Sequence, residues 1–164
     1  MEYNTSKFMV MDNKDIRLKM LILKYDEHTL QLSKILNEIT EKDLYRFDVY
    51  SKSVPWIVGG QVSFRFQIAN VLGIEINPST DQIFRTDGTQ LYIEYPSLET
   101  FRKDWEIISP ILKNEILELD NEELFTFSEE EPKMKGSFFD LLSFMIERER
   151  ENIDALILWR GLLT

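Results

Sequence analysis

The pattern that decides the fold is clearest in residues 15–39, DIRLKMLILKYDEHTLQLSKILNEI. Apolar side chains recur there every three or four residues, which is the spacing of one face of an amphipathic α-helix. The positions on this face are Leu18, Leu21, Ile22, Tyr25, Leu32, Ile35, Leu36 and Ile39. Asp12 or Asn13 is expected to cap the helix, because a short polar side chain can accept hydrogen bonds from the free amide groups of the first turn.

Three further segments carry signals of long helices. A second helix is predicted from a cap at Ser51 or Ser53 to Gly73, with Pro55 in its first turn. A third is predicted from Ser97 and a fourth from Ser137 to Leu163. The expected core positions of the second helix are Ile57, Phe64, Ile68, Val71 and Leu72, and those of the third are Leu98, Phe101, Trp105, Ile108, Leu112 and Ile116.

The segments between these helices differ in length and composition. Residues 40–43 break the helical pattern, and Pro110 is expected to kink the third helix. Residues 73–96 read as a long crossing loop with one short extended run at 90–95, and residues 118–131 as an acidic, solvated loop. The prediction is therefore an all-α protein, a single four-helix-bundle domain over 1–164 with long crossover loops. An antiparallel first pair of helices would be followed by two crossovers.

Composition narrows the classes of function. The 164 residues include no cysteine and one histidine, and 29 acidic against 19 basic residues give a net charge of −10. Such a charge repels phosphate backbones, so no nucleic-acid partner is expected. No apolar run approaches the ~20 residues of a membrane helix, and no secretory signal is recognisable, so we expect a cytoplasmic protein without a membrane partner. Phosphate-binding loops and serine-hydrolase motifs are absent from the sequence.

Two segments resemble the DinB/YfiT-like helical-bundle proteins. They are residues 56–62, WIVGGQV, and residues 148–156, RERENIDAL. In that family the second helix opens with a Trp-x-x-Gly-His pattern, and the last helix carries His-Glu-x-x-His-Ile-Gly-Gln followed by an apolar-Arg ending. The positions that match here are Trp56, Gly59, Glu149, Ile153, Leu156 and Arg160. The resemblance would span most of the chain and implies a DinB-like four-helix bundle.

The sequence departs from this family at its metal site. The resemblance implies three histidine ligands, one from the second helix and an i, i+4 pair from the last. Gly60, Arg148 and Asn152 occupy those positions. Glycine offers no ligand, arginine brings a positive charge, and an asparagine amide is a weak oxygen donor. We therefore expect a degenerate metal site and no transition-metal cofactor.

His28 and Glu149 are the two candidates for catalytic residues. His28 lies on the apolar face of the first helix, where it could act as a general base or a lone ligand. We interpret it instead as a core histidine bonded to a neighbouring helix. Glu149 could accept a proton or pair with Arg148 or Arg150, but we interpret it as part of a solvated helix face.

Glycine and polar residues mark a candidate cavity. Gly59 and Gly60 each cost the second helix about 1 kcal/mol relative to alanine, which either close helix packing or an open cavity would explain. Close packing is the interpretation we favour. Asn152 requires a hydrogen-bond partner if it is buried. The residues expected to line a cavity are Trp56, Gln61, Asn152 and Trp159.

The sequence leaves two functions open. The first is a DinB-like bundle that has lost its metal site and acts as a small-ligand-binding or interaction module, with a homodimer implied by the resemblance. The alternative is a metal- or thiol-dependent transferase or hydrolase of the DinB/YfiT-like type with an atypical site. The single histidine and the lack of cysteine favour the first. They leave the ligand unidentified.

Overall fold

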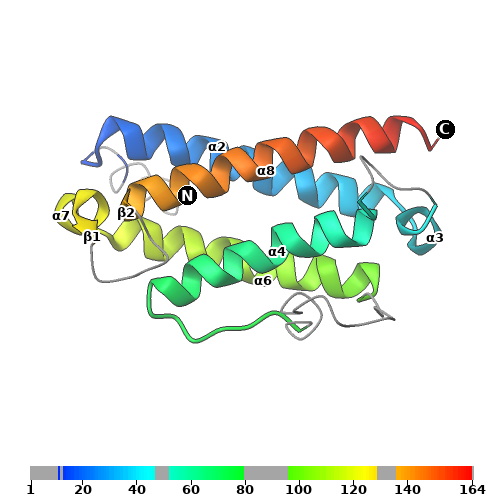
Figure 1. The fold of residues 1–164 in the computed structure, drawn as a ribbon, viewed down its shortest axis with the longest axis horizontal. Helices are drawn as coiled ribbons and strands as arrows, with labels where there is room; N and C mark the ends of the chain where they lie inside the picture. The colour runs from blue at the N-terminus through cyan, green and yellow to red at the C-terminus, as the bar shows by residue number, and fades with distance from the viewer. Residues whose placement is uncertain (1–10, 12, 47–51, 80–95, 129–135, 164) are drawn as a thin grey trace, which may run out of the picture.

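The computed structural model describes residues 11, 13–46, 52–79, 96–128 and 136–163. Most of these residues are helical, which confirms the all-α prediction. The long helices in these ranges are α2 (Ile16–Glu38), α4 (Val54–Val71), α6 (Leu98–Glu118) and α8 (Phe138–Gly161). They lie side by side with their long axes roughly aligned (Figure 1). None of the described helices combines the length and apolar character that a membrane crossing demands.

The helices begin where short polar residues can cap them. Ser53, Ser97 and Ser137 each accept a hydrogen bond from a backbone amide in the first turn of the helix that follows. Asp15 caps α2 by accepting from the amide of Arg17, so the expectation of Asn13 was wrong. The other two predicted caps, Asp12 and Ser51, lie outside the described residues. Helix α6 continues through Pro110.

Two predicted loops contain short regular elements instead. Thr40 caps helix α3 (Glu41–Leu44), which includes residues 41–43, and the acidic segment contains helix α7 (Asn121–Phe125). Each begins with a reciprocal capping box, in which the cap and the residue three positions later bond each other's amides. Strands β1 (Phe127–Ser128) and β2 (Gly136–Ser137) pair antiparallel, with Phe127 opposite Ser137. The extended run predicted at 90–95 and the acidic residues 129–131 lie outside the described residues.

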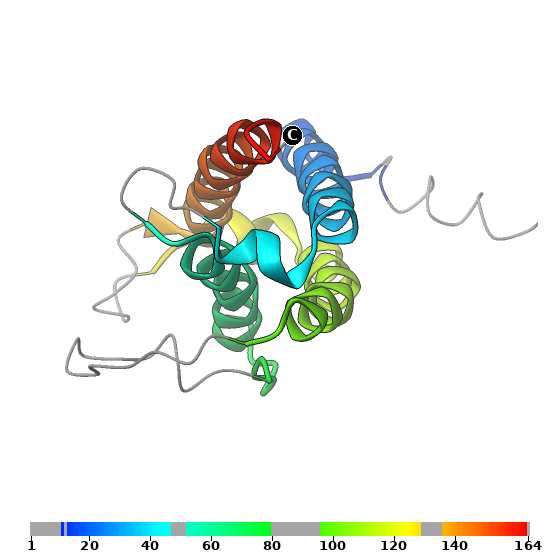
Figure 2. The same cartoon turned by 90° about the vertical axis from the view of Figure 1, so that its right-hand side faces the viewer.

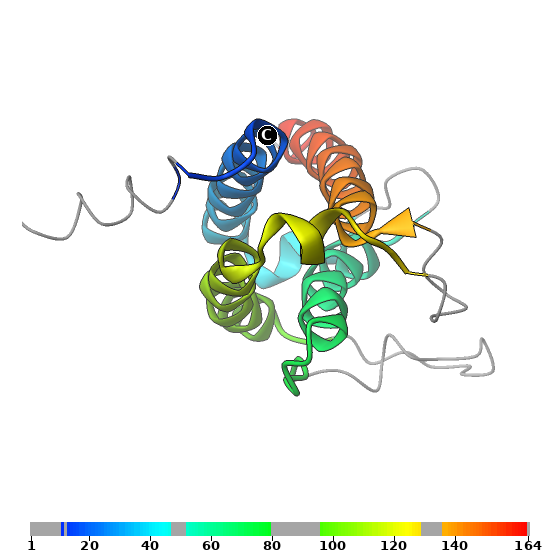
Figure 3. The same cartoon turned by 90° about the vertical axis from the view of Figure 1, so that its left-hand side faces the viewer.

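Each long helix contacts two of the others around a common core. α2 packs against α6 and α8, and α4 packs against the same two helices. α2 and α4 therefore occupy diagonal corners, as the end-on view in Figure 2 shows. The short helix α3 lies at that end of the molecule, and α7 lies at the opposite end (Figure 3).

The contacts between helices fix their directions. α2 and α8 run the same way, because His28 meets Glu149 and, further along both helices, Glu38 meets Arg160. α6 runs opposite to α2, since Tyr25 bonds Ser109 whereas Leu36 bonds Arg102. α4 runs opposite to α8 and hence parallel to α6 (Figure 1). The predicted two crossovers are therefore wrong: one crossover, between α4 and α6, joins parallel neighbours, and the other two links connect diagonal helices.

The core positions predicted for α2 and α6 are all buried. The face predicted for α4 is only partly correct. Ile57 and Ile68 are buried, but Val71 is 48% exposed. The buried face of α4 includes two polar residues instead, Gln61 and Arg65, with exposed fractions of 1% and 0%. These two residues position the candidate site.

Candidate functional site

A seam of two polar pairs joins α4 to α8. Asn152 Nδ2 donates a hydrogen bond to Gln61 Oε1 at 3.0 Å. One turn later on α4 and one turn earlier on α8, Arg65 Nε donates to Glu149 Oε1 at 2.6 Å. Residues four apart on α4 and three apart on α8 point the same way, so antiparallel packing brings both pairs into register. The Arg65–Glu149 pair belongs to a buried ionic cluster, and the Gln61–Asn152 pair lines a pocket that opens to the surface.

Arg65 is the centre of the buried ionic cluster, which also contains Glu149 and His28. Its guanidinium carbon lies 3.8 Å from the ring centroids of both Tyr25 and Trp105. Besides the Nε bond, Nη2 donates to Glu149 Oε2 at 3.0 Å and to the Tyr25 carbonyl at 3.4 Å. Nη1 donates to Thr29 Oγ1 at 2.7 Å and to Ser109 Oγ at 2.9 Å. The five N–H donors of the guanidinium group therefore all have acceptors.

Glu149 is fully buried, so the interpretation of a solvated side chain was wrong. Its partner is Arg65, from another helix, and neither Arg148 nor Arg150. Burial by itself raises the pKa of the Glu149 carboxyl group, but the charge of Arg65 and the hydrogen bonds with His28 and Arg65 outweigh it and hold the pKa below its ordinary value. A carboxylate stabilised in this way is a poor proton acceptor.

His28 is a core histidine, 5% exposed, as we interpreted it. Its Nδ1 lies 3.1 Å from Glu149 Oε2, so it does have a carboxylate partner. Neither His28 nor Glu149 lines the pocket described below. The two catalytic candidates are brought together, but within a packed and charge-compensated core.

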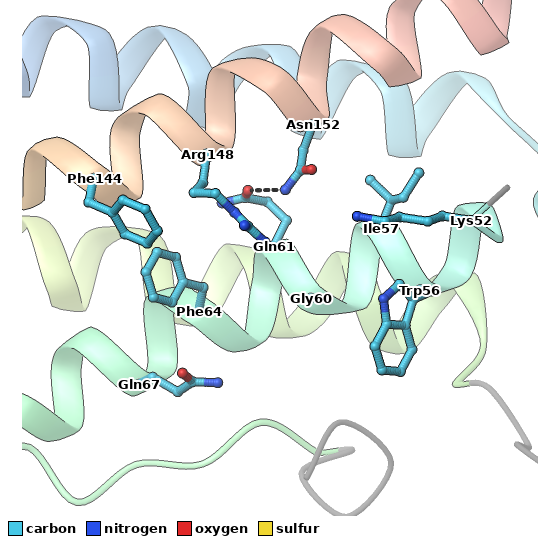
Figure 4. A pocket seen from close by; sticks show the side chains of 10 residues that line it. All are labelled: Lys52, Trp56, Ile57, Gly60, Gln61, Phe64, Gln67, Phe144, Arg148 and Asn152. Carbon is cyan, nitrogen blue, oxygen red and sulfur yellow. Dashed lines mark hydrogen bonds between the residues drawn. The ribbon is translucent and has the colours of Figure 1, made fainter. Parts of the chain in front are cut away.

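The pocket on the other side of the seam has a volume of about 300 Å³. We call it the α4/α8 pocket. It is lined by Lys52, Trp56, Ile57, Gly60, Gln61, Phe64, Gln67, Phe144, Arg148 and Asn152. Figure 4 shows Phe64 and Phe144 at one end and Trp56 at the other, with Gly60 between them on α4. Phe64 and Phe144 meet edge to face, with ring centroids 6.0 Å apart.

Gly60 leaves the floor of the pocket open. A Cβ atom built at this position would meet no atom within 4 Å, so the expectation of close helix packing at Gly60 was wrong. The cavity interpretation of this glycine agrees with its position on the pocket lining. An alanine would therefore be accommodated without displacing a neighbour.

The polar groups of the pocket are incompletely paired. Gln61 Nε2 is buried and has no hydrogen-bond partner within the described residues. Because Gln61 Oε1 accepts from Asn152 Nδ2, the unpartnered group of the Gln61 amide is its NH₂ donor. Arg148 and Lys52 form no ion pair with a carboxylate of the described residues.

Three of the four residues expected to line a cavity do so: Trp56, Gln61 and Asn152. Trp159 does not. It is 1% exposed and belongs to the hydrophobic core, where its indole Nε1 has no hydrogen-bond partner among the described residues. It lies seven residues beyond Asn152, two turns along α8.

The positions of the implied metal ligands also lie together. Gly60, Arg148 and Asn152 all line the α4/α8 pocket. Their chemistry does not fit a metal: one lacks a side chain, one is a cation, and the third uses its amide in the bond to Gln61. Across the described residues, no group of three or more His, Asp or Glu side chains is arranged to hold a metal ion.

Sequence reasoning missed Arg65, Lys52 and Phe144. Arg65 is four residues after Gln61 and seven after Val58, a spacing that places all three on one helix face. That spacing was the available signal, but an arginine on a helix is usually solvent-exposed. Lys52 precedes the helix and Phe144 is 55% exposed, so no periodic pattern marks either of them.

Comparison with known proteins gave no match. No family model matches the sequence, and neither the curated proteins nor the solved structures include a match to this chain.

Proposed function

We propose that this protein is a small-molecule-binding module whose ligand occupies the α4/α8 pocket. The observation that carries the proposal is the amide donor of Gln61, a residue 1% exposed on the pocket lining beside Gly60, which has no hydrogen-bond partner among the described residues. A buried N–H group without an acceptor costs about 1–3 kcal/mol. A ligand acceptor atom would remove that cost.

The shape of the pocket supports the same proposal. Ligand sites are concave and mostly apolar, with a few polar groups that fix orientation. The α4/α8 pocket combines aromatic side chains at both ends with amides and cations between them (Figure 4). Its volume of about 300 Å³ is at the small end of the usual range for ligand sites.

The proposed frame is a four-helix bundle of the DinB-like type. Its support is the meeting of Gly60, Arg148 and Asn152, which the sequence resemblance assigns to one site, at a single pocket. The resemblance itself stays a prediction, since the comparisons gave no match.

The alternative of a transferase or hydrolase has no observation in its favour among the described residues. His28 and Glu149 would have to do its chemistry, yet they are 5% and 0% exposed and bonded to each other. It stays a prediction with a direct test. Any turnover found for this protein should disappear in His28→Ala if that hypothesis is correct and persist if it is not.

An interaction role is proposed for a second surface. Ile16, Met20, Leu23 and Leu30 form a stripe on α2, and each is between 58% and 72% exposed. Their spacing of four, three and seven residues keeps them on one helix face. We propose that a second copy of the chain covers this α2 stripe in a homodimer.

The experiment for ligand binding uses a small-fragment collection and backbone amide NMR. We expect some fragments to shift the amides of α4 and α8 around Gly60 and Asn152. Gly60→Leu, which fills the pocket from its floor, should abolish those shifts. Shifts that persist in Gly60→Leu, or a collection that leaves these amides unmoved, would contradict the proposal.

A matched control guards against a general loss of folding. Gly161 also has open space around an added Cβ, and it lies at the end of α8, away from the pocket lining. Gly161→Leu should bind fragments as the unsubstituted protein does. Both variants should give a folded amide spectrum.

A further inference from the structure

The α4/α8 pocket has the opposite charge to the molecule that contains it. The chain carries a net charge of −10, with 29 acidic residues. Among the residues that the structure describes, the pocket lining contains two basic residues, Lys52 and Arg148, and no acidic one. Cations concentrated in a cleft raise the local concentration of anions.

Within the described ranges, neither cation forms an ion pair with a carboxylate. Acidic residues flank Arg148 on its own helix, but Glu147 bonds Arg150 instead. The Arg148 guanidinium carbon lies 6.0 Å from the Phe144 ring centroid, at the edge of cation–π contact. In Figure 4 the Lys52 side chain extends back along α4 towards the middle of the pocket, and Arg148 reaches down from α8 beside Gln61.

The amide donor lies beside Arg148 in the middle of the pocket (Figure 4). Gln61 Nε2 is a buried donor with no partner in the described part of the chain, and Asn152 beside it bonds the Gln61 side chain. Hydrogen bonds from amide and guanidinium N–H groups to an ionised acceptor are roughly twice as strong as those to a neutral one. The donor set is therefore suited to an oxyanion.

The rest of the lining is suited to a flat apolar body. Phe64 and Phe144 form an edge-to-face pair at one end, and Trp56, 37% exposed, forms the other. Between them the absence of a side chain at Gly60 leaves room for a planar group. A ligand with a ring system and one anionic end would use both parts of the pocket.

We infer that the ligand of the α4/α8 pocket is a small organic anion, in which a carboxylate or phosphate group is attached to a planar apolar body. The anionic group contacts Arg148, Lys52 and the Gln61 amide, and the planar body lies over Gly60 between the aromatic side chains. This inference rests on the proposed function and specifies the chemistry of its ligand.

The test compares four probes that share one ring system: 2-naphthoate, 2-naphthyl phosphate, 2-naphthamide and 2-naphthylmethylamine. Dissociation constants are measured by calorimetry or NMR titration with the full chain. We expect at least one of the two anions to bind about tenfold more tightly than the neutral amide, and the amine to bind most weakly. The stronger of the two anions then identifies carboxylate or phosphate as the preferred group.

Charge variants locate the effect in the pocket. Arg148→Gln should weaken binding of the preferred anion about tenfold and weaken binding of 2-naphthamide by a clearly smaller factor. Arg150→Gln removes the same charge two residues away, where the side chain pairs with Glu147 outside the pocket lining, and should have little effect. Anion binding should also weaken with added salt.

The outcomes separate this inference from the proposed function. If 2-naphthamide binds as tightly as both anions, and Gly60→Leu abolishes all binding, the anionic ligand is wrong and the pocket is still a binding site. If Gly60→Leu leaves binding unchanged, both are wrong. Equal losses in Arg148→Gln and Arg150→Gln, or no binding of either anion at millimolar concentration, also overturn the anionic ligand.

Discussion

The Arg65–Glu149 pair is an ion pair with both side chains at 0% exposure. Removing two charges from water costs several kcal/mol each, and only good geometry and further hydrogen bonds compensate for it. Here the carboxylate receives two bonds from the guanidinium group, and Thr29 and Ser109 accept two more. The pair therefore fixes which residues of α4 and α8 meet, more than it adds stability.

Removing one charge of this pair should be strongly destabilising. Glu149→Gln leaves the Arg65 guanidinium buried without a counter-charge, and we expect a loss of about 3–5 kcal/mol in the free energy of unfolding. Chemical denaturation measures it. Glu151→Gln, an exposed position two residues away, should change the free energy by less than about 0.5 kcal/mol. Similar effects of the two substitutions would contradict the prediction.

The same residue should make stability depend on pH. Because the folded pKa of Glu149 lies below its ordinary value of 4.5, the unfolded chain binds a proton first as the pH falls. Its contribution is complete above about pH 4.5 and is lost as the pH falls through the folded pKa. We expect the free-energy difference between the wild type and Glu149→Gln to shrink in that window. A difference that is constant with pH would contradict this.

For single residues, the sequence predicted which side chains are buried better than it predicted which residues they contact. The spacing placed His28 on the buried face of its helix, and the structure confirms it. Its partner Glu149 is 121 residues away in the sequence, and no local pattern can connect the two. Glu149 also sits within the charged run 147–151, which resembles a solvated helix surface until Arg65 is placed against it.

Helix α4 shows where pattern reasoning works and where it fails. Its start was predictable, because a serine cap followed by a proline in the first turn is a local signal. Its buried face was not, because Gln61 and Arg65 interrupt the apolar spacing. The strands β1 and β2 are two residues each, too short to produce an alternating pattern.

Gly60 gives a prediction about the stability of α4. Gly60→Ala should raise the free energy of unfolding by about 0.5–1 kcal/mol, because alanine is the better helix former and its Cβ meets open space. Thermal or chemical denaturation measures the change. Gly136→Ala should lower the free energy of unfolding, since φ is +141° there and the added Cβ would lie 2.7 Å from Asp140 Oδ2. The prediction fails if both substitutions act in the same direction.

For the whole molecule, the α2 stripe predicts association. Replacing Leu23 and Leu30 together by glutamine removes apolar surface that is 66% and 72% exposed in the single chain. Sedimentation at high micromolar concentration should show a dimer for the wild type and a monomer for this variant. The variant should keep its stability, because exposed positions contribute little to the core. A wild type that is strictly monomeric would contradict the dimer.

The place of α8 in the sequence has a consequence for folding during synthesis. α8 is made after α2, α4 and α6, yet its Glu149 balances Arg65 and contacts His28, which lie 84 and 121 residues earlier. Until α8 leaves the ribosome, α2, α4 and α6 can close around Arg65 only by burying an unpaired cation, which is strongly unfavourable. We therefore expect the core around Arg65 to stay open until α8 has been made.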